Sequence, residues 1–61
     1  MYVAEMGDDG TWGVAQNGVV LYDCMFSRAV AEALADMENS EKPPADWLEA
    51  KDRLESIGLI V

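Results

Sequence analysis

The dipeptide Asn17-Gly18 constrains the fold more than any other feature, because it stands between two runs of strand-forming residues. A two-residue hairpin turn needs positive φ angles at both positions, and asparagine followed by glycine tolerates them best. The dipeptide therefore predicts a tight hairpin. Its register would place Gln16 opposite Val19, Ala15 opposite Val20, Val14 opposite Leu21 and Trp12 opposite Asp23.

This register divides the hairpin side chains between two faces. One face is the predicted core face, with Trp12, Val14, Val19 and Leu21. The opposite face carries Thr11, Ala15, Val20 and Tyr22, and it is less polar than the solvated face of an antiparallel sheet normally is. Ala15, Val20 and Tyr22 are therefore candidate residues of an interface.

Further strand and helix signals lie on either side of the hairpin. Residues 2–6 read as another strand, joined to the hairpin through the turn-forming segment 7–10. After the hairpin, apolar residues recur at helical spacing: Phe26, Val30, Ala33, Leu34 and Met37. Ser27 is the expected N-cap, and the predicted helix runs to about Asn39.

Pro43-Pro44 forbids continuation of that helix and predicts a turn. A second helix is expected to begin at residues 44–46, where Asp46 and Glu49 resemble a capping box, and to end at Gly58. Its predicted buried stripe consists of Trp47, Ala50, Leu54 and Ile57. The apolar residues 59–61 are expected to pack against the sheet or a partner.

These elements predict an α+β fold in one small domain, residues 1–61. The predicted architecture is βββαα, a three-stranded antiparallel meander followed by two helices packed on one sheet face. A chain this short buries only about 60% of the surface that its unfolded form exposes, so a partner subunit would help to stabilise it.

The content of cysteine and histidine excludes several kinds of chemistry. Cys24 is the single cysteine and histidine is absent, which rules out an intrachain disulfide, a thiolate or imidazole zinc site, and a histidine base. No catalytic residue, metal or cofactor is predicted, and the chain is expected not to be an enzyme. Cys24 is expected to be a packed, unreactive thiol. One cysteine fits a reducing compartment, so we expect a cytoplasmic location, and the apolar run 18–22 is too short to span a membrane.

Acidity is the feature with most functional content. Twelve Asp and Glu residues stand against four Lys and Arg, which gives a net charge of −8, and residues 1–27 contain no base. Asp8 and Asp9 lack the ligand spacing of a calcium loop and are read as turn residues. The charge serves either solubility or attraction of a basic partner, with Asp8, Asp9, Glu32 and Asp36 as candidate binding residues. Direct binding to nucleic acid or membrane is disfavoured.

The tryptophan-bearing hairpin that leads into the segment 26–33 (FSRAVAEA), in a short acidic chain, resembles the small accessory proteins of bacteriophages and mobile elements. The resemblance implies binding to a host enzyme, in the host cytoplasm, with inhibition or redirection of that enzyme and in some cases an acidic surface presented to a nucleic-acid site. The sequence hypothesis is therefore a protein-binding module that inhibits or modulates a basic, nucleic-acid-handling protein. The alternative is a structural or assembly protein that forms a homodimer through the apolar second sheet face.

Overall fold

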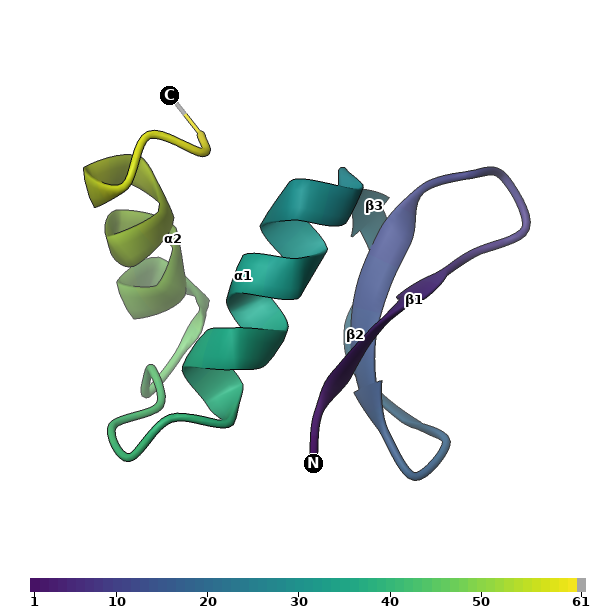
Figure 1. Cartoon of the computed structure of the whole chain (residues 1–61), viewed down its shortest axis with the longest axis horizontal. Helices are drawn as coiled ribbons and strands as arrows, with labels where there is room; N and C mark the ends of the chain where they lie inside the picture. The colour runs from purple at the N-terminus through teal and green to yellow at the C-terminus, as the bar shows by residue number, and fades with distance from the viewer. Residues whose placement is uncertain (61) are drawn as a thin grey trace.

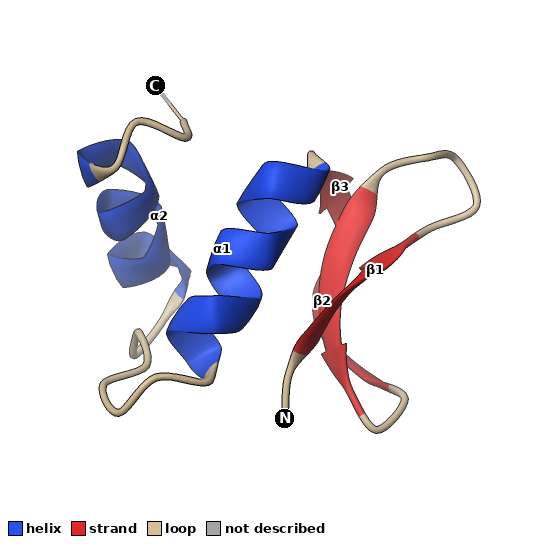
Figure 2. Ribbon diagram, viewed as in Figure 1, coloured by secondary structure: helices blue, strands red, loops and turns tan. Residues whose placement is uncertain are grey.

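The computed structural model describes residues 1–60, which form three strands and two helices (Figures 1 and 2). They are β1 (Val3–Met6), β2 (Trp12–Gln16), β3 (Val19–Phe26), α1 (Arg28–Glu38) and α2 (Trp47–Ser56). The strands pair antiparallel in the order β1-β2-β3. The predicted α+β, βββαα fold is confirmed.

The β2–β3 turn has the geometry that its sequence requires. Asn17 and Gly18 have φ angles of 53° and 81°, so both occupy the left-handed region that a two-residue hairpin needs. Next to this turn, Gln16 pairs with Val19 and Ala15 pairs with Val20, as predicted.

Beyond these two pairs the predicted register is wrong. Val14 lies opposite Tyr22 instead of Leu21, and Trp12 lies opposite Phe26 instead of Asp23. Extra residues in β3 make two irregularities in the ladder, and each extra residue changes which face the following side chains occupy. Tyr22 consequently lies on the same face as Val14, which is the face that the helices cover.

Helix α1 begins after its predicted N-cap, Ser27, and ends at Asn39, close to where its end was predicted. The Ser27 hydroxyl accepts a hydrogen bond from the Val30 N–H at 3.3 Å, and Asn39 is the C-cap. Val30, Ala31, Leu34 and Ala35 form its buried face. This face packs on β1 and β2, so α1 is the layer next to the sheet (Figure 1).

Hydrogen bonds cap both ends of helix α2. The Asp46 carboxylate accepts from the Glu49 N–H at 2.9 Å, and the Glu49 carboxylate accepts from the Ala45 N–H at 2.8 Å. Gly58 has a φ of 82°, and the Leu59 N–H donates to the Leu54 carbonyl at 3.0 Å. These bonds satisfy backbone groups that a helix end leaves free.

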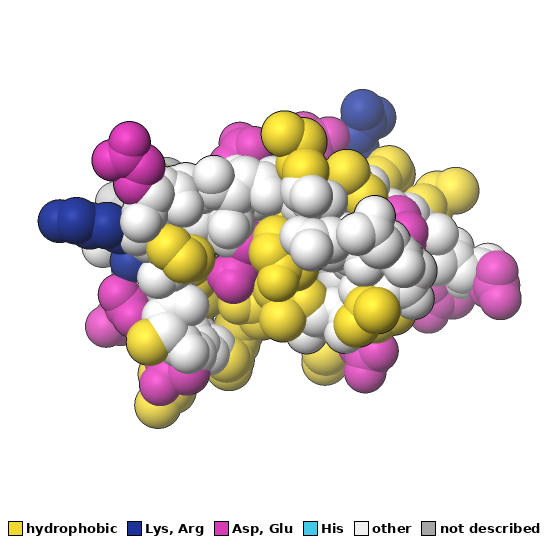
Figure 3. Space-filling model, turned by 90° about the horizontal axis from the view of Figure 1, so that it is seen from below, with side chains coloured by type: hydrophobic (Ala, Val, Ile, Leu, Met, Phe, Trp, Pro, Cys, Tyr) yellow, Lys and Arg dark blue, Asp and Glu magenta, His cyan; other side chains and the backbone are white. Residues whose placement is uncertain are grey.

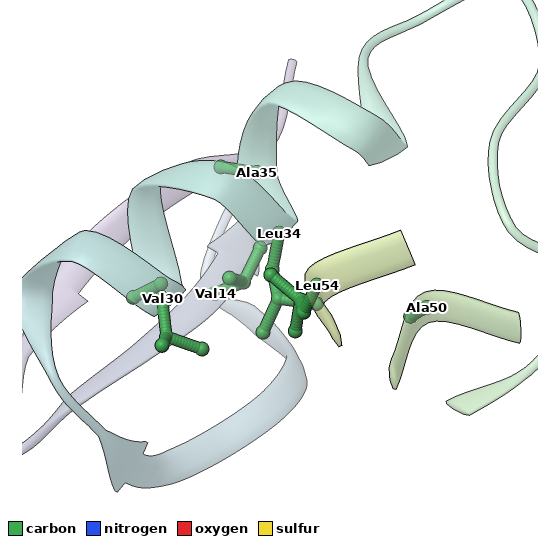
Figure 4. Close-up of a cluster of buried hydrophobic side chains, with 7 residues drawn as sticks. Val14, Val30, Leu34, Ala35, Ala50 and Leu54 are labelled. Atoms are coloured by element: carbon green, nitrogen blue, oxygen red, sulfur yellow. The ribbon is translucent and has the colours of Figure 1, made fainter. Parts of the chain in front are cut away.

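The core lies between the sheet and the two helices, and Figure 4 shows Val14, Leu34 and Leu54 at its centre. Both helices lie on the same side of the sheet, with α2 packed on the far side of α1 (Figure 1). Trp47 of α2 also reaches β3, since its ring centroid lies 5.9 Å from that of Tyr22 and 5.4 Å from that of Phe26.

Several predicted core residues are exposed. Val19 lies next to the hairpin turn, Leu21 lies within the register shift between Val20 and Tyr22, and Ile57 follows the last residue of α2; all three are exposed. Trp12 is half-buried against the core, whereas Trp47 remains 39% exposed. Among the apolar C-terminal residues, Ile60 packs against the core and Leu59 is exposed, while Val61 lies outside the described residues.

Candidate functional site

The open face of the sheet, on the side away from the helices, carries an apolar row. Directly paired residues of antiparallel strands point to the same face, so Val3, Ala15 and Val20 form a row across all three strands. Ala15, in the middle, is 2% exposed, whereas Val3 and Val20 are 50% and 52% exposed. The structure thus places the predicted Ala15 and Val20 together on this face and adds Val3.

Tyr22 does not belong to this face, which corrects the sequence prediction. Its ring packs edge-on against Phe26, with centroids 6.4 Å apart, and against Trp47 on the helix side. Burial, together with the nearby carboxylates of Glu38 and Asp46, raises the pKa of the Tyr22 hydroxyl above its ordinary value. Tyr22 is therefore a packing residue, and its assignment to the open face followed from an unbroken hairpin register.

The irregular part of β3 folds across the open face at Gly13. A Cβ atom at Gly13 would lie 2.5 Å from the Tyr22 carbonyl oxygen and 3.0 Å from the Cys24 nitrogen. Gly7 directly follows β1, and a Cβ atom there would lie 2.8 Å from the Cys24 Cβ. The sheet is therefore strongly curled, and two glycines allow its strands to approach so closely.

Cys24 is exposed, whereas the sequence predicted a packed thiol. Its carbonyl oxygen lies 2.8 Å from the Thr11 hydroxyl oxygen, which fastens this part of β3 to the end of the β1–β2 loop. The prediction assumed a regular strand that leads directly into α1, and the irregular ladder instead turns this residue outward.

An acidic hollow adjoins the apolar row. All four carboxylates of residues 1–27 line this surface hollow of about 580 Å³: Glu5, Asp8, Asp9 and Asp23. The other lining residues are Met6, Gly7 and Cys24. Sequence reasoning singled out Asp8 and Asp9 and missed Glu5 and Asp23. Glu5 could have been found from the period of two, because it follows Val3 on the same face of β1. Asp23 depends on the curl of β3, which the sequence pattern does not indicate.

Asp9 is held in place within the turn, as the turn prediction requires. Its carboxylate accepts from the Thr11 N–H at 3.1 Å and lies 2.6 Å from the Thr11 hydroxyl oxygen. These hydrogen bonds lower the pKa of Asp9 below its ordinary value. Within residues 1–60, His, Cys, Asp and Glu side chains form no group of three that could hold a metal ion.

Glu32 and Asp36 lie on α1, apart from this hollow. Glu32 pairs with Arg28 at 2.7 Å, and the Arg28 guanidinium lies 5.3 Å from the centre of the Trp12 ring. Asp36 borders a groove of about 450 Å³ between the two helices, whose apolar lining comes from Ala33, Met37 and Ile57. The four predicted acidic residues are therefore divided between two surfaces.

Acidic side chains lie on both layers of the molecule, since Glu5 and Asp23 belong to the sheet and Glu32 and Asp36 belong to α1. On the face shown in Figure 3, acidic side chains are spread from one end of the molecule to the other, with hydrophobic side chains between them. Any binding surface must therefore be identified by its local combination of charge and apolar area.

Comparison with known proteins gives no match to a family model, a curated protein or a solved structure. Among the described residues, neither helix has the length and apolar character needed to cross a membrane.

Proposed function

We propose that the chain is a non-catalytic, cytoplasmic protein-binding module that inhibits or modulates a basic, nucleic-acid-handling host protein, in the manner of phage-encoded accessory proteins. The observation that carries the proposal is uncompensated acidity. Two of the four basic residues sit in ion pairs on their own helices, Arg28 with Glu32 at 2.7 Å and Arg53 with Glu49 at 2.9 Å. Since residues 1–27 contain no base, a basic protein would meet an attractive field over the sheet.

The magnitude of the charge refines the proposal. The molecule measures 29 Å along its longest axis, and a DNA duplex of that length carries about 17 phosphate charges. The net charge of −8 is about half of that. Charge alone is thus a weak imitation of nucleic acid, and the proposal also requires apolar contact.

The test is capture of basic proteins from a host lysate on the immobilised chain. We expect a basic partner to be retained at low ionic strength, to be lost in high salt, and to be displaced by added duplex DNA. The charge-reversed variant with Glu32→Lys and Asp36→Lys should retain less of it. Retention that is indifferent to salt and DNA would contradict the proposal.

A homodimer that uses the apolar row is the alternative function, and the half-exposed Val3 and Val20 favour it. Light scattering distinguishes the two functions. Salt screens the repulsion between two acidic copies, so a homodimer would strengthen in high salt whereas the complex with a basic partner would weaken.

A further inference from the structure

The open face combines an apolar half and an acidic half along the same strands. Val3 and Glu5 are two residues apart on β1 and pair with Ala15 and Gly13 of β2, so they share this face. Along β1, Val3 of the apolar row is therefore followed on this face by Glu5 of the acidic hollow. A ligand lying along β1 would meet valine first and carboxylates next.

Among residues 1–60, no basic side chain lines this hollow. The residues that line it include four carboxylates and no Lys or Arg, and both ion pairs of the described residues lie on the helices. Four carboxylates around one hollow repel each other, and a cationic group placed among them would relieve that repulsion.

We propose that the open face docks a segment of a basic protein in which aliphatic side chains adjoin lysine or arginine. The aliphatic side chains cover the apolar row, and the cationic groups enter the acidic hollow. This inference rests on the proposed function and adds the surface and the chemistry of the segment that it binds.

Charge complementarity favours a basic segment over a second copy of the chain as the ligand of the open face. The open face of a second copy brings no Lys or Arg to the acidic hollow, because residues 1–27 contain no base, and a two-fold contact that set the two hollows opposite each other would be destabilised by like charges. The groove between α1 and α2 is less suitable for a basic segment, because its lining residues include Arg53 as well as Asp36.

The experiment uses the isotope-labelled full chain and a defined probe. The probe is a short synthetic peptide that joins a run of aliphatic residues to a run of lysines, and the control peptide has glutamates in place of the lysines. We expect the lysine peptide to shift backbone amide resonances of β1, β2 and β3 around the apolar row and the acidic hollow. The glutamate peptide should shift none of them.

Two pairs of variants test the surface itself. Val19 and Val20 are adjacent, exposed, and on opposite faces of β3, so Val20→Lys and Val19→Lys make the same change on the two faces. We expect Val20→Lys to weaken peptide binding about tenfold through lost apolar contact and like-charge repulsion, with a much smaller effect of Val19→Lys. Asp23→Asn should weaken binding more than Asp52→Asn, an equal charge change on α2.

Three results would overturn the inference. They are amide shifts centred on the groove between the helices, shifts spread evenly over the surface, and a dimer that protects the open face. If the lysate capture depends on salt but the peptide maps elsewhere, the proposed function stands and the docking surface is wrong. If neither the peptide nor a basic lysate protein binds, the proposed function fails as well.

Discussion

Gly13 lies where β3 crosses β2, and its missing side chain is a structural requirement. An added Cβ would meet backbone atoms of β3, with the Tyr22 carbonyl oxygen at 2.5 Å and the Asp23 carbonyl carbon at 3.0 Å. Backbone cannot move aside as the end of a flexible side chain can. The position therefore selects glycine because of the close approach of two strands.

We predict that Gly13→Ala lowers the free energy of unfolding by about 2 kcal/mol, because the added methyl forces the strands apart. Urea denaturation followed by tryptophan fluorescence measures this change. Gly10→Ala is the control, since Gly10 has a φ of 86° and open space around it, so its cost is conformational only. A loss at Gly13 no larger than that at Gly10 would contradict the predicted strand contact.

At this scale the sequence predicts local geometry well and long-range register poorly. The positive φ of Asn17 and the cap at Ser27 follow from short-range preferences of the backbone. The side of the sheet that Tyr22 occupies depends on extra residues in β3. The β3 backbone at these residues packs closely against Gly13 of β2, where no side chain is in the way. Period-two alternation contains no information about such a bulge.

At the scale of elements, Asn39 connects the end of α1 to the start of β1. Its side-chain oxygen accepts from the Tyr2 N–H at 2.7 Å, and its side-chain amide donates to the Tyr2 carbonyl at 2.8 Å. The asparagine side chain thus pairs with the chain just before β1 as a neighbouring strand would.

Asn39→Ala should lower the free energy of unfolding by about 1 kcal/mol, because it removes both of these exposed hydrogen bonds. Thermal denaturation by circular dichroism measures the effect. Asn39→Asp keeps the acceptor for the Tyr2 N–H and loses the donor, so we expect an intermediate loss. Equal stability of all three proteins would show that the link contributes nothing.

The first turn of α2 predicts a dependence of stability on pH. The hydrogen bond from the Ala45 N–H, followed by that from Arg53, lowers the pKa of Glu49 below its ordinary value of 4.5. A lowered folded-state pKa adds stability that is present above the ordinary pKa and is lost as the pH falls through the lowered value.

We therefore expect the free energy of unfolding of the wild type to fall more steeply than that of Glu49→Gln as the pH is lowered below the ordinary glutamate pKa of 4.5. The variant has no titrating group at this position. Urea denaturation across the acidic range measures the difference. Asp9→Asn is the matched control, because the pKa of Asp9 is also lowered and its variant should retain the Glu49 component. Parallel pH profiles for the wild type and Glu49→Gln would contradict the role of this cap.

The elements themselves were largely predictable, whereas their packing was not. Capping residues, Pro43-Pro44 and Gly58 mark the helix limits through local chemistry. The exposure of Ile57 and the partial exposure of Trp47 follow from the position of α2 beyond α1. Helical periodicity shows which face of a helix is apolar, but it does not show which other element packs against that face. For the same reason the groove between the helices was missed.

At the scale of the whole molecule, a net charge of −8 lies within a radius of gyration of 10.7 Å. The Debye length is about 30 Å at 0.01 M salt and about 3 Å at 1 M. Carboxylates on opposite sides of the molecule therefore repel each other at low salt and are almost completely screened at high salt. The two ion pairs on the helix surfaces contribute little to stability and lose little on screening. Self-repulsion therefore dominates the response of the fold to salt.

We predict that the melting temperature rises by several degrees as sodium chloride is added, since about 1 kcal/mol corresponds to about 4–8 °C in a domain of this size. Circular dichroism melts measure the rise, and a variant with Asp36→Asn and Asp52→Asn should show a smaller one. A melting temperature that falls with salt would mean that the ion pairs outweigh the repulsion. The predicted sign also bears on the proposed function, because salt should stabilise the fold while it weakens binding to a basic partner. Loss of a captured protein in high salt would then report on the interface, since the chain itself is more stable under that condition.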